Sequence, residues 1–267
     1  MITLTTDFGL SDPYVGLMKG IILGIAPAAA IVDLTHDVAP QDVLGAALVI
    51  ERAIGCFPEN TIHVVVVDPG VGSGRRAVAV RAHGNLWIGP DNGVLTTVLD
   101  AAQPDAVSLT RPEHHRRSVS ATFHGRDVFA PIAARLESGM PMASLGDPAR
   151  DLVRLDLPTP ERTADGLTLH VLHADRFGNL VTDLDRQAYD RWRGDLPLDA
   201  SGILRIDEVE IGGLSRTYAD VPEGAALAYF GSGGRLEIAV RNGSAADRFD
   251  PSTASNRIVL SAGSLRI

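Results

Sequence analysis

The chain is poor in the features that mark disulfide-bonded, nucleic-acid-binding or membrane proteins. Cys56 is its only cysteine, which excludes internal disulfides and any metal site built from cysteines. Lys and Arg number 24 against 33 Asp and Glu, with no basic block, so we expect no nucleic-acid partner. The apolar stretch 20–32 is too short to span a bilayer and contains Pro27. With no basic leader either, we expect a cytoplasmic protein without a membrane partner.

The remaining composition is that of a globular protein with a sizeable core. Of the 267 residues, 45% are hydrophobic and 21% are charged. This length suits two unequal domains better than one large domain. The net charge of −9 tolerates or attracts cationic ligands, although as a hint to function it is weak.

The first half of the sequence alternates between strand-like and helix-like segments. Ser11 and Pro13 form a helix start, with a capping residue and a proline at the first helical position. This alternation predicts an α/β domain over 1–156 with a central, mostly parallel sheet. The expected strands are 2–6, 30–34, 61–67, 76–81 and 86–88, and the expected helices are 14–25, 40–54, 91–99 and 128–136.

The pattern changes after residue 156. The stretch 156–166 has two prolines and no apolar period, and we interpret it as a linker. Beyond it, short alternating runs divided by glycine turns predict a smaller, mostly-β, barrel-like domain over 167–267. These runs are 167–171, 203–211, 226–230, 236–240 and 257–260.

The most informative segment is 64–76, Val-Val-Val-Val-Asp-Pro-Gly-Val-Gly-Ser-Gly-Arg-Arg. Four β-branched residues in a row indicate a strand buried on both faces. The strand ends at Asp68, and a glycine loop then leads to Arg75 and Arg76. In open α/β sheets, ligands bind at the carboxyl ends of such strands. The alternative is an ordinary β-turn, because Asp-Pro-Gly is favoured turn chemistry.

Two further positions in the first half are candidates for a site. Asp7 follows the first strand, where a carboxylate can hold both hydroxyls of a ribose, unless it only closes an Asx-turn. His124 stands between Phe123 and Gly125, just before a predicted helix. It is a plausible site group, although a loop histidine is more often simply solvated. We expect Asp127 to cap that helix.

In the second half, residues 173–179 separate two runs with an aromatic, a carboxylate and an amide side chain. Phe177 offers a π-face to a base, and Asn179 can both donate to and accept from an adenine edge. The segment 88–93 can be explained as a turn followed by a helix cap, and 231–234 and 241–243 as simple hairpin turns.

Five motifs together resemble one family. Thr-Asp-Phe-Gly at Asp7, Asp-Pro-Gly-Val-Gly at Asp68, Gly-Pro-Asp-Asn-Gly at Asn92, Thr-Phe-His-Gly-Arg-Asp at His124 and Phe-Gly-Asn at Asn179 occur in this order. The chain thereby resembles, from about Asp7 to Asn242, the S-adenosyl-L-methionine (SAM) hydroxide adenosyltransferases, also called adenosine-forming SAM hydrolases.

The resemblance implies an activity, a set of site residues and an assembly. Family members release adenosine and methionine by attack of a water-derived nucleophile on the ribose C5′, and SAM is their substrate, with no cofactor or metal. An Asp-Arg-His set maps onto Asp68, Arg75 and His124 as catalytic residues. A homotrimer with sites at subunit interfaces is also implied. The implied substrate-binding residues are Asp7, Asp12, Phe123, Asp175, Phe177, Asn179, Tyr218, Ser232 and Asn242.

The same resemblance separates this chain from the related halogenating enzymes. That branch carries tyrosines where this chain has Asp68 and His124, and an additional loop at the position of 83–85. Gln41 replaces a tryptophan of that branch and Gly233 replaces an arginine, so how the methionine carboxylate is held stays open.

The reaction agrees with these residues. The leaving group is a neutral thioether expelled from a sulfonium, so no general acid is needed, and hydroxide meeting a cation neutralises charge. The fixed charge of Arg75 can lower the pKa of a bound water. Asp68 or His124 would then accept the proton, and the sequence does not choose between them.

Two other functions compete with hydrolysis. A SAM- or nucleotide-binding module or methyltransferase of Rossmann type has a similar strand and glycine loop. However, the loop here leads into a predicted strand at 76–81 and follows about the third strand, whereas the Rossmann loop follows the first and opens a helix. A non-enzymatic structural protein would leave the five ordered motifs unexplained.

Overall fold

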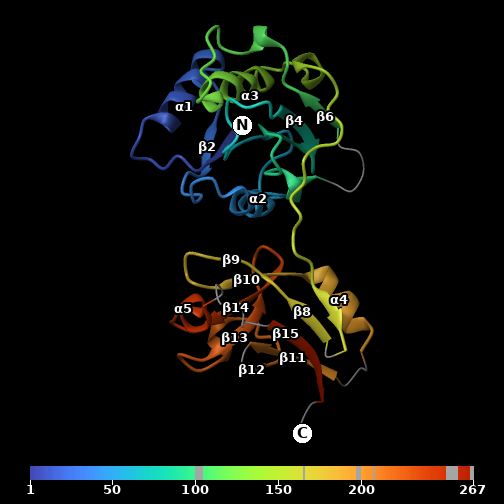
Figure 1. Cartoon of the computed structure of the whole chain (residues 1–267). Helices are drawn as coiled ribbons and strands as arrows, with labels where there is room; N and C mark the ends of the chain where they lie inside the picture. Colours follow the sequence, from blue (N-terminus) through green and yellow to red (C-terminus); the bar gives the residue numbers. More distant parts are fainter. Residues whose placement is uncertain (100–104, 165, 197–199, 207, 251–257, 265–267) are drawn as a thin grey trace. The chain divides into compact units, whose positions relative to one another are not determined.

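The chain folds into two compact units, Met1–Leu155 and Asp156–Ile267 (Figure 1). The structure is a computed structural model that describes residues 1–99, 105–164, 166–196, 200–206, 208–250 and 258–264. Within these residues, no helix has the length and apolarity needed to cross a membrane.

The first unit is built on a six-stranded sheet with the order β2-β1-β3-β5-β4-β6. The neighbours β2, β1, β3 and β5 pair in parallel, while β4 is antiparallel to both β5 and β6. The expectation of a mostly parallel sheet is confirmed. The strands are β1 (Ile2–Thr6), β2 (Ile31–Thr35), β3 (Ile62–Val66), β4 (Ala77–Ala82), β5 (Asn85–Pro90) and β6 (Asp105–Ser108).

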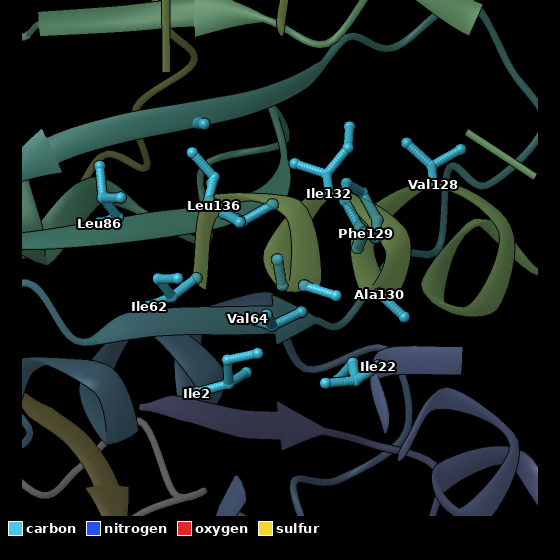
Figure 2. Packing of buried hydrophobic residues seen from close by; sticks show 14 of the residues in the cluster. Ile2, Ile22, Ile62, Val64, Leu86, Val128, Phe129, Ala130, Ile132 and Leu136 are labelled. Atoms are coloured by element: carbon cyan, nitrogen blue, oxygen red, sulfur yellow. The ribbon is translucent and has the colours of Figure 1, made fainter. Parts of the chain in front are cut away.

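Helices cover both faces of this sheet. On one face, α1 (Tyr14–Ile25) and α3 (Ala130–Glu137) pack on alternate residues of β1 and β3, including Val64, as Figure 2 shows. On the other face, α2 (Val43–Glu51) packs against Val65 and the strand β4. Burial on both faces explains the run of valines that begins in β3 at Val64, because successive side chains of a strand point to opposite faces.

Several predictions for the first unit need correction. Most of the predicted helix 91–99 is a turn, with only a short 3₁₀ helix at Thr96–Val98, because Asp91 is held by Arg76 and by the backbone N–H of Val153. Ser11 does not cap α1: Pro13 occupies the cap position and no side chain caps the helix. The strand β6 was not predicted.

The second unit contains two antiparallel sheets, with the orders β13-β14-β10-β9 and β12-β11-β15-β8-β7. In the described residues they form open sheets around a shared apolar cluster, and no closed barrel. The strands are β7 (Glu161–Thr163), β8 (Gly166–Leu169), β9 (Val171–Ala174), β10 (Leu180–Asp185), β11 (Ala200–Ile206), β12 (Val209–Gly212), β13 (Ala226–Phe230), β14 (Arg235–Val240) and β15 (Ile258–Ser264), and the helices are α4 (Arg186–Gly194) and α5 (Ala245–Phe249).

The second unit also differs from its prediction in detail. The expected linker 156–166 contains the edge strand β7, which pairs with β8 although its side chains are exposed. The run 203–211 is a hairpin of β11 and β12. The elements β10, α4 and α5 were not predicted, and residue 257 of the expected last strand lies outside the described residues.

A buried histidine predicts a pH dependence of stability in the first unit. His63 on β3 stacks on Trp87 with ring centroids 4.0 Å apart, and its Nδ1 lies 2.8 Å from Thr3 Oγ1. Burial lowers the pKa of His63 to about 4. Between pH 6.5 and 4 the unfolded chain binds this proton and the native chain does not. The free energy of unfolding should therefore fall by about 3 kcal/mol across that window.

The measurement is denaturant unfolding at pH 7 and pH 4.5, followed by fluorescence of Trp87 in a Trp192→Phe background, because Trp192 in the second unit also fluoresces. A His63→Phe variant keeps an aromatic ring against Trp87 but has nothing to titrate, so its stability should vary less over the window. Equal pH dependence in both proteins would contradict this role for His63.

Candidate active site

A glycine loop joins the carboxyl end of β3 to β4 and carries Asp68 and Arg75. At Gly72 the backbone has φ +78°, and a Cβ there would lie 2.3 Å from the carbonyl oxygen of Ala121. Glycine is required for this close approach. The approach brings the loop against the segment that leads to His124. Three residues separated by up to 56 positions thus meet at one edge of the sheet.

Asp68, Arg75 and His124 form one hydrogen-bonded set. Arg75 Nε donates to Asp68 Oδ1 at 3.0 Å, and Arg75 Nη2 donates to Asp68 Oδ2. The same Nη2 lies 2.8 Å from His124 Nδ1. The Arg75 and Asp68 side chains are 10% and 5% exposed, so this is a buried, bidentate ion pair.

The contact with Arg75 defines the protonation state of His124. A guanidinium has only donors, so Nδ1 accepts and the ring proton of the neutral imidazole is on Nε2. Burial, and then the charge of Arg75, lower the pKa of His124. At neutral pH His124 is therefore a neutral ring that offers an N–H from Nε2.

The backbone after His124 begins with a π-helical turn, Gly125–Phe129, before α3. Asp127 is fully buried within it and accepts hydrogen bonds from Arg126, Arg116 and the N–H of Ser120. Burial raises the pKa of Asp127, but these bonds outweigh it and hold the pKa at about 2. The predicted helix cap is thus wrong: Asp127 is an internal anchor for the segment 116–127, which carries His124.

A cavity of about 390 Å³ opens beside this set in the first unit. Asp7 contributes a carboxylate, whose Oδ2 accepts the Gln41 N–H at 2.8 Å. Phe8, Tyr14 and Phe123 contact one another edge to face. Arg75 is not among the lining residues, although it contacts both Asp68 and His124. The lining residues are Asp7, Phe8, Tyr14, Pro40, Gln41, Val66, Asp68, Pro69, Val71, Thr122, Phe123, His124 and Gly125.

The second unit has its own cavity of about 530 Å³, lined by Phe177, Asn179, Tyr218, Val240, Asn242 and Gly243. Asp175 shapes the turn that presents two of them, because its Oδ1 accepts the N–H groups of Phe177 and Asn179 at 2.8 and 2.9 Å. The Phe177 side chain is 78% exposed, so its ring is available to a ligand.

Not every implied binding residue lies in a cavity wall. Asp12 is exposed in the turn before α1, and Ser232 is exposed in the turn between β13 and β14. Neither lines the two cavities described here. Phe8 and Tyr14 line the first cavity although neither was expected at the site. Phe8 stands next to Asp7 in its motif, which was an available signal, whereas Tyr14 reads only as the start of a helix.

The sequence and the fold are similar to those of known proteins. The SAM hydroxide adenosyltransferase N-terminal domain family matches residues 2–146, and the C-terminal domain family of the same enzymes matches 169–256. The crystal structure of an uncharacterised conserved protein from Thermotoga maritima superposes with a TM-score of 0.86 at 33% identity, covering 98% of this chain and 100% of that chain.

Curated relatives cover almost the whole chain. The (R)-S-adenosyl-L-methionine hydrolase of Salinispora tropica is 38% identical over 269 residues, covering 98% of each chain. The enzyme of the same name from Thermus thermophilus is 41% identical over 254 residues, covering 90% of this chain and 91% of that protein. A fluorinase from Nocardia brasiliensis is 30% identical over 272 residues, covering 90% and 89%. The chain therefore belongs to the SAM hydroxide adenosyltransferase family.

Proposed function

We propose that this protein hydrolyses SAM to adenosine and L-methionine. The observation that carries the proposal is the buried Asp68–Arg75–His124 set at the wall of a cavity that also contains the Asp7 carboxylate. The same reaction is supported by the comparisons: the chain matches both domain families of the SAM hydroxide adenosyltransferases, and it resembles proteins named SAM hydrolase.

In the proposed reaction, a water oxygen forms a bond to the ribose C5′ while the C5′–S bond breaks. The electron pair of that bond goes to sulfur, which leaves as the neutral thioether of methionine. The water proton goes to Asp68. His124 cannot take it in this arrangement, because its Nδ1 accepts from Arg75 and its Nε2 already carries hydrogen. His124 instead orients the water through Nε2–H.

Arg75 supports this step from behind the cavity wall. Its positive charge favours developing hydroxide over water, and its bidentate contact holds the Asp68 carboxylate in one orientation. Hydroxide approaching a sulfonium neutralises charge, so exclusion of bulk water makes the encounter more favourable. The proposal needs no cofactor and no metal. Among the described residues, no three His, Cys, Asp or Glu side chains cluster as metal ligands would.

We assign the substrate contacts to the two cavities and to three residues outside their walls, Asp12, Asp175 and Ser232. We assign the ribose hydroxyls to Asp7, with Phe123 beside the sugar and Asp12 near this end. The adenine is assigned to the cavity of the second unit, with Phe177 or Tyr218 stacking on it. Asp175 and Ser232 are assigned to the methionine end, and Asn179 and Asn242 to the edge of the base.

The test is to incubate the protein with SAM in the presence of a chelator and to separate the products by chromatography. The names of the relatives specify the (R) sulfonium, so both epimers at sulfur are tested, and we expect the (R) form to react faster. Adenosine and methionine are the expected products. S-adenosylhomocysteine would indicate a methyltransferase, and binding without turnover would leave only a SAM-binding protein.

Halide should not replace water as the nucleophile. The buried Asp68 carboxylate stands at the cavity wall and repels an approaching anion. In addition, β4 and β5 are joined by the tight turn at His83 and Gly84, without the additional loop of the halogenating relatives. Mass spectrometry of the nucleoside formed in concentrated chloride or fluoride measures this. A 5′-halo-5′-deoxyadenosine peak would overturn the hydrolase assignment.

We further propose that the working unit is a cytoplasmic homotrimer in which one SAM molecule contacts the first unit of one subunit and the second unit of its neighbour. The family resemblance supports this assembly, and a three-fold axis allows such heterologous contacts to close. Cys56 is an exposed free thiol, which suits a reducing compartment.

Mixed trimers test the shared site. Asp68→Asn chains and Asn179→Ala chains, each inactive alone, should recover about a quarter of wild-type activity when dissociated together and reassembled in equal amounts, because about one site in four then combines two intact halves. Mixing Asp68→Asn with His124→Ala is the control and should recover nothing, since both changes lie in the first unit. A monomer by light scattering, or no recovery despite proven subunit exchange, would exclude the shared site.

A further inference from the structure

A chain of hydrogen bonds leads from a buried carboxylate to the cavity of the second unit. Glu237 on β14 and Tyr229 directly opposite on β13 are 6% and 8% exposed. Tyr229 OH donates to Glu237 Oε2 at 2.5 Å, and Tyr218 OH lies 2.6 Å from Tyr229 OH. Asn179 Nδ2 then donates to Tyr218 OH at 3.2 Å. Glu237 and Tyr229 are not among the residues that line the cavity.

The carboxylate sets the direction of every bond in this chain. A carboxylate only accepts hydrogen bonds, so Tyr229 gives its single O–H to Glu237. Burial and the bond to Glu237 raise the pKa of Tyr229, which keeps this phenol protonated. Tyr229 can then only accept from Tyr218. Tyr218 therefore donates its O–H to Tyr229, and its oxygen accepts from Asn179.

The amide of Asn179 is fixed from two sides. One Nδ2 hydrogen goes to Tyr218, and the other goes to Asp175 Oδ2 at 2.9 Å. Both donors are used, while Oδ1 has no hydrogen-bond partner among the described residues. This differs from the expectation that Asn179 both donates to and accepts from a base. The wall formed by Asn179 and Tyr218 offers acceptors only.

We propose that Glu237 and Tyr229 are positioning residues that select a purine carrying an amino group over one carrying an oxo group at the same position. The inference rests on the proposed binding of adenosine in this cavity, with Phe177 as the stacking ring and the Tyr218 hydroxyl at the edge of the base. An amino group donates to Asn179 Oδ1. An oxo group would face that oxygen lone pair to lone pair, and a buried acceptor left unpaired weakens binding by about tenfold or more.

The experiment titrates the full chain with adenosine and with inosine in a calorimeter. Wild-type protein should bind adenosine at least about tenfold more tightly. In Tyr229→Phe, Tyr218 loses its acceptor, and its O–H becomes free to donate to the oxo group of inosine, so the preference should fall to about twofold or less.

Two further variants separate this role from a loss of packing. Tyr189→Phe removes a half-buried phenol on α4 that takes no part in these hydrogen bonds. This variant should keep the preference for adenosine over inosine. Glu237→Gln introduces an amide that can donate to Tyr229 and so reverse the chain, and it should lower the preference in the same direction as Tyr229→Phe. If circular dichroism shows that Tyr229→Phe does not fold, the preference of Glu237→Gln tests the inference instead.

Two results would overturn the inference: equal binding of the two nucleosides by wild-type protein, or an unchanged preference in Tyr229→Phe. The SAM assay is read separately. Hydrolysis without nucleoside preference removes only this inference, and preference without hydrolysis removes only the proposed reaction. Binding of neither nucleoside counts against the adenine site itself.

Discussion

Replacing Asp68 with asparagine should lower kcat for SAM hydrolysis by about 10²–10⁴-fold, with a much smaller change in the affinity for SAM. Asparagine has nearly the same shape and can still accept from Arg75 through its carbonyl oxygen. It cannot take a proton from water at neutral pH, and it leaves the buried Arg75 charge uncompensated. Steady-state kinetics beside calorimetric binding of SAM separates the two quantities.

The neighbouring ion pair supplies a matched control. Arg76 follows Arg75 in sequence and pairs with the buried Asp91, which also accepts the N–H of Val153. Asp91→Asn removes the same charge from an arginine–aspartate pair that does not line the cavity. It should lower the melting temperature and leave kcat within a few-fold of wild type. If the two variants lose kcat equally, Asp68 has only a structural role.

The sequence predicted the first-unit sheet well because burial on both faces leaves a strong signal. The strand β3, which holds three valines of the run 64–67, and the start of α1 at Tyr14 follow directly from the apolar pattern. The signal was weak where a strand is an exposed edge. In β7 all three side chains are exposed, and only pairing with β8 makes it a strand. Such pairing is a tertiary contact, which local sequence does not contain.

The segment 91–99 shows a second limit. Its apolar residues suit a helix, and in the structure they are buried, but in a turn and a 3₁₀ helix. The Asp91 side chain accepts bonds from residues 15 and 62 positions away, and these bonds hold the backbone in a turn. An aspartate that caps a helix and an aspartate that forms a buried ion pair cannot be distinguished from the sequence alone. Asp127 was misinterpreted for the same reason.

The candidate site shows what motifs can and cannot give. The glycines around Asp68 indicated a loop with an unusual backbone, and Gly72 does need one. The motifs also pointed to Asp68, Arg75 and His124 as a set. Which atom donates to which is a matter of geometry, and the contact between Arg75 Nη2 and His124 Nδ1 is the observation on which we propose Asp68 rather than His124 as the proton acceptor.

Replacing Asp7 with alanine should weaken SAM binding by about 10- to 100-fold and leave kcat at saturation nearly unchanged, because hydrogen bonds to a charged group contribute about 1.5–3 kcal/mol each. The ribose contacts are the same in the ground and transition states, so their loss raises KM. Calorimetry with SAM and saturation kinetics measure both effects. Asp37→Ala, which removes an exposed carboxylate of the same charge, is the control for net charge and should bind SAM normally.

A ligand without the 2′-hydroxyl shows whether the loss of affinity in Asp7→Ala comes from contacts with the ribose. Wild-type protein should bind 2′-deoxyadenosine more weakly than adenosine, whereas Asp7→Ala should bind the two equally, because the partner of that hydroxyl is already gone. Asp7→Asn should lie between these, since it keeps an acceptor and loses the charge. Gln41 N–H holds one carboxylate oxygen in place from a left-handed backbone with φ 67°, so the orientation of Asp7 is set before substrate binds. If the 2′-hydroxyl still contributes in Asp7→Ala, another residue holds the ribose, and Asp7 only closes the turn after β1.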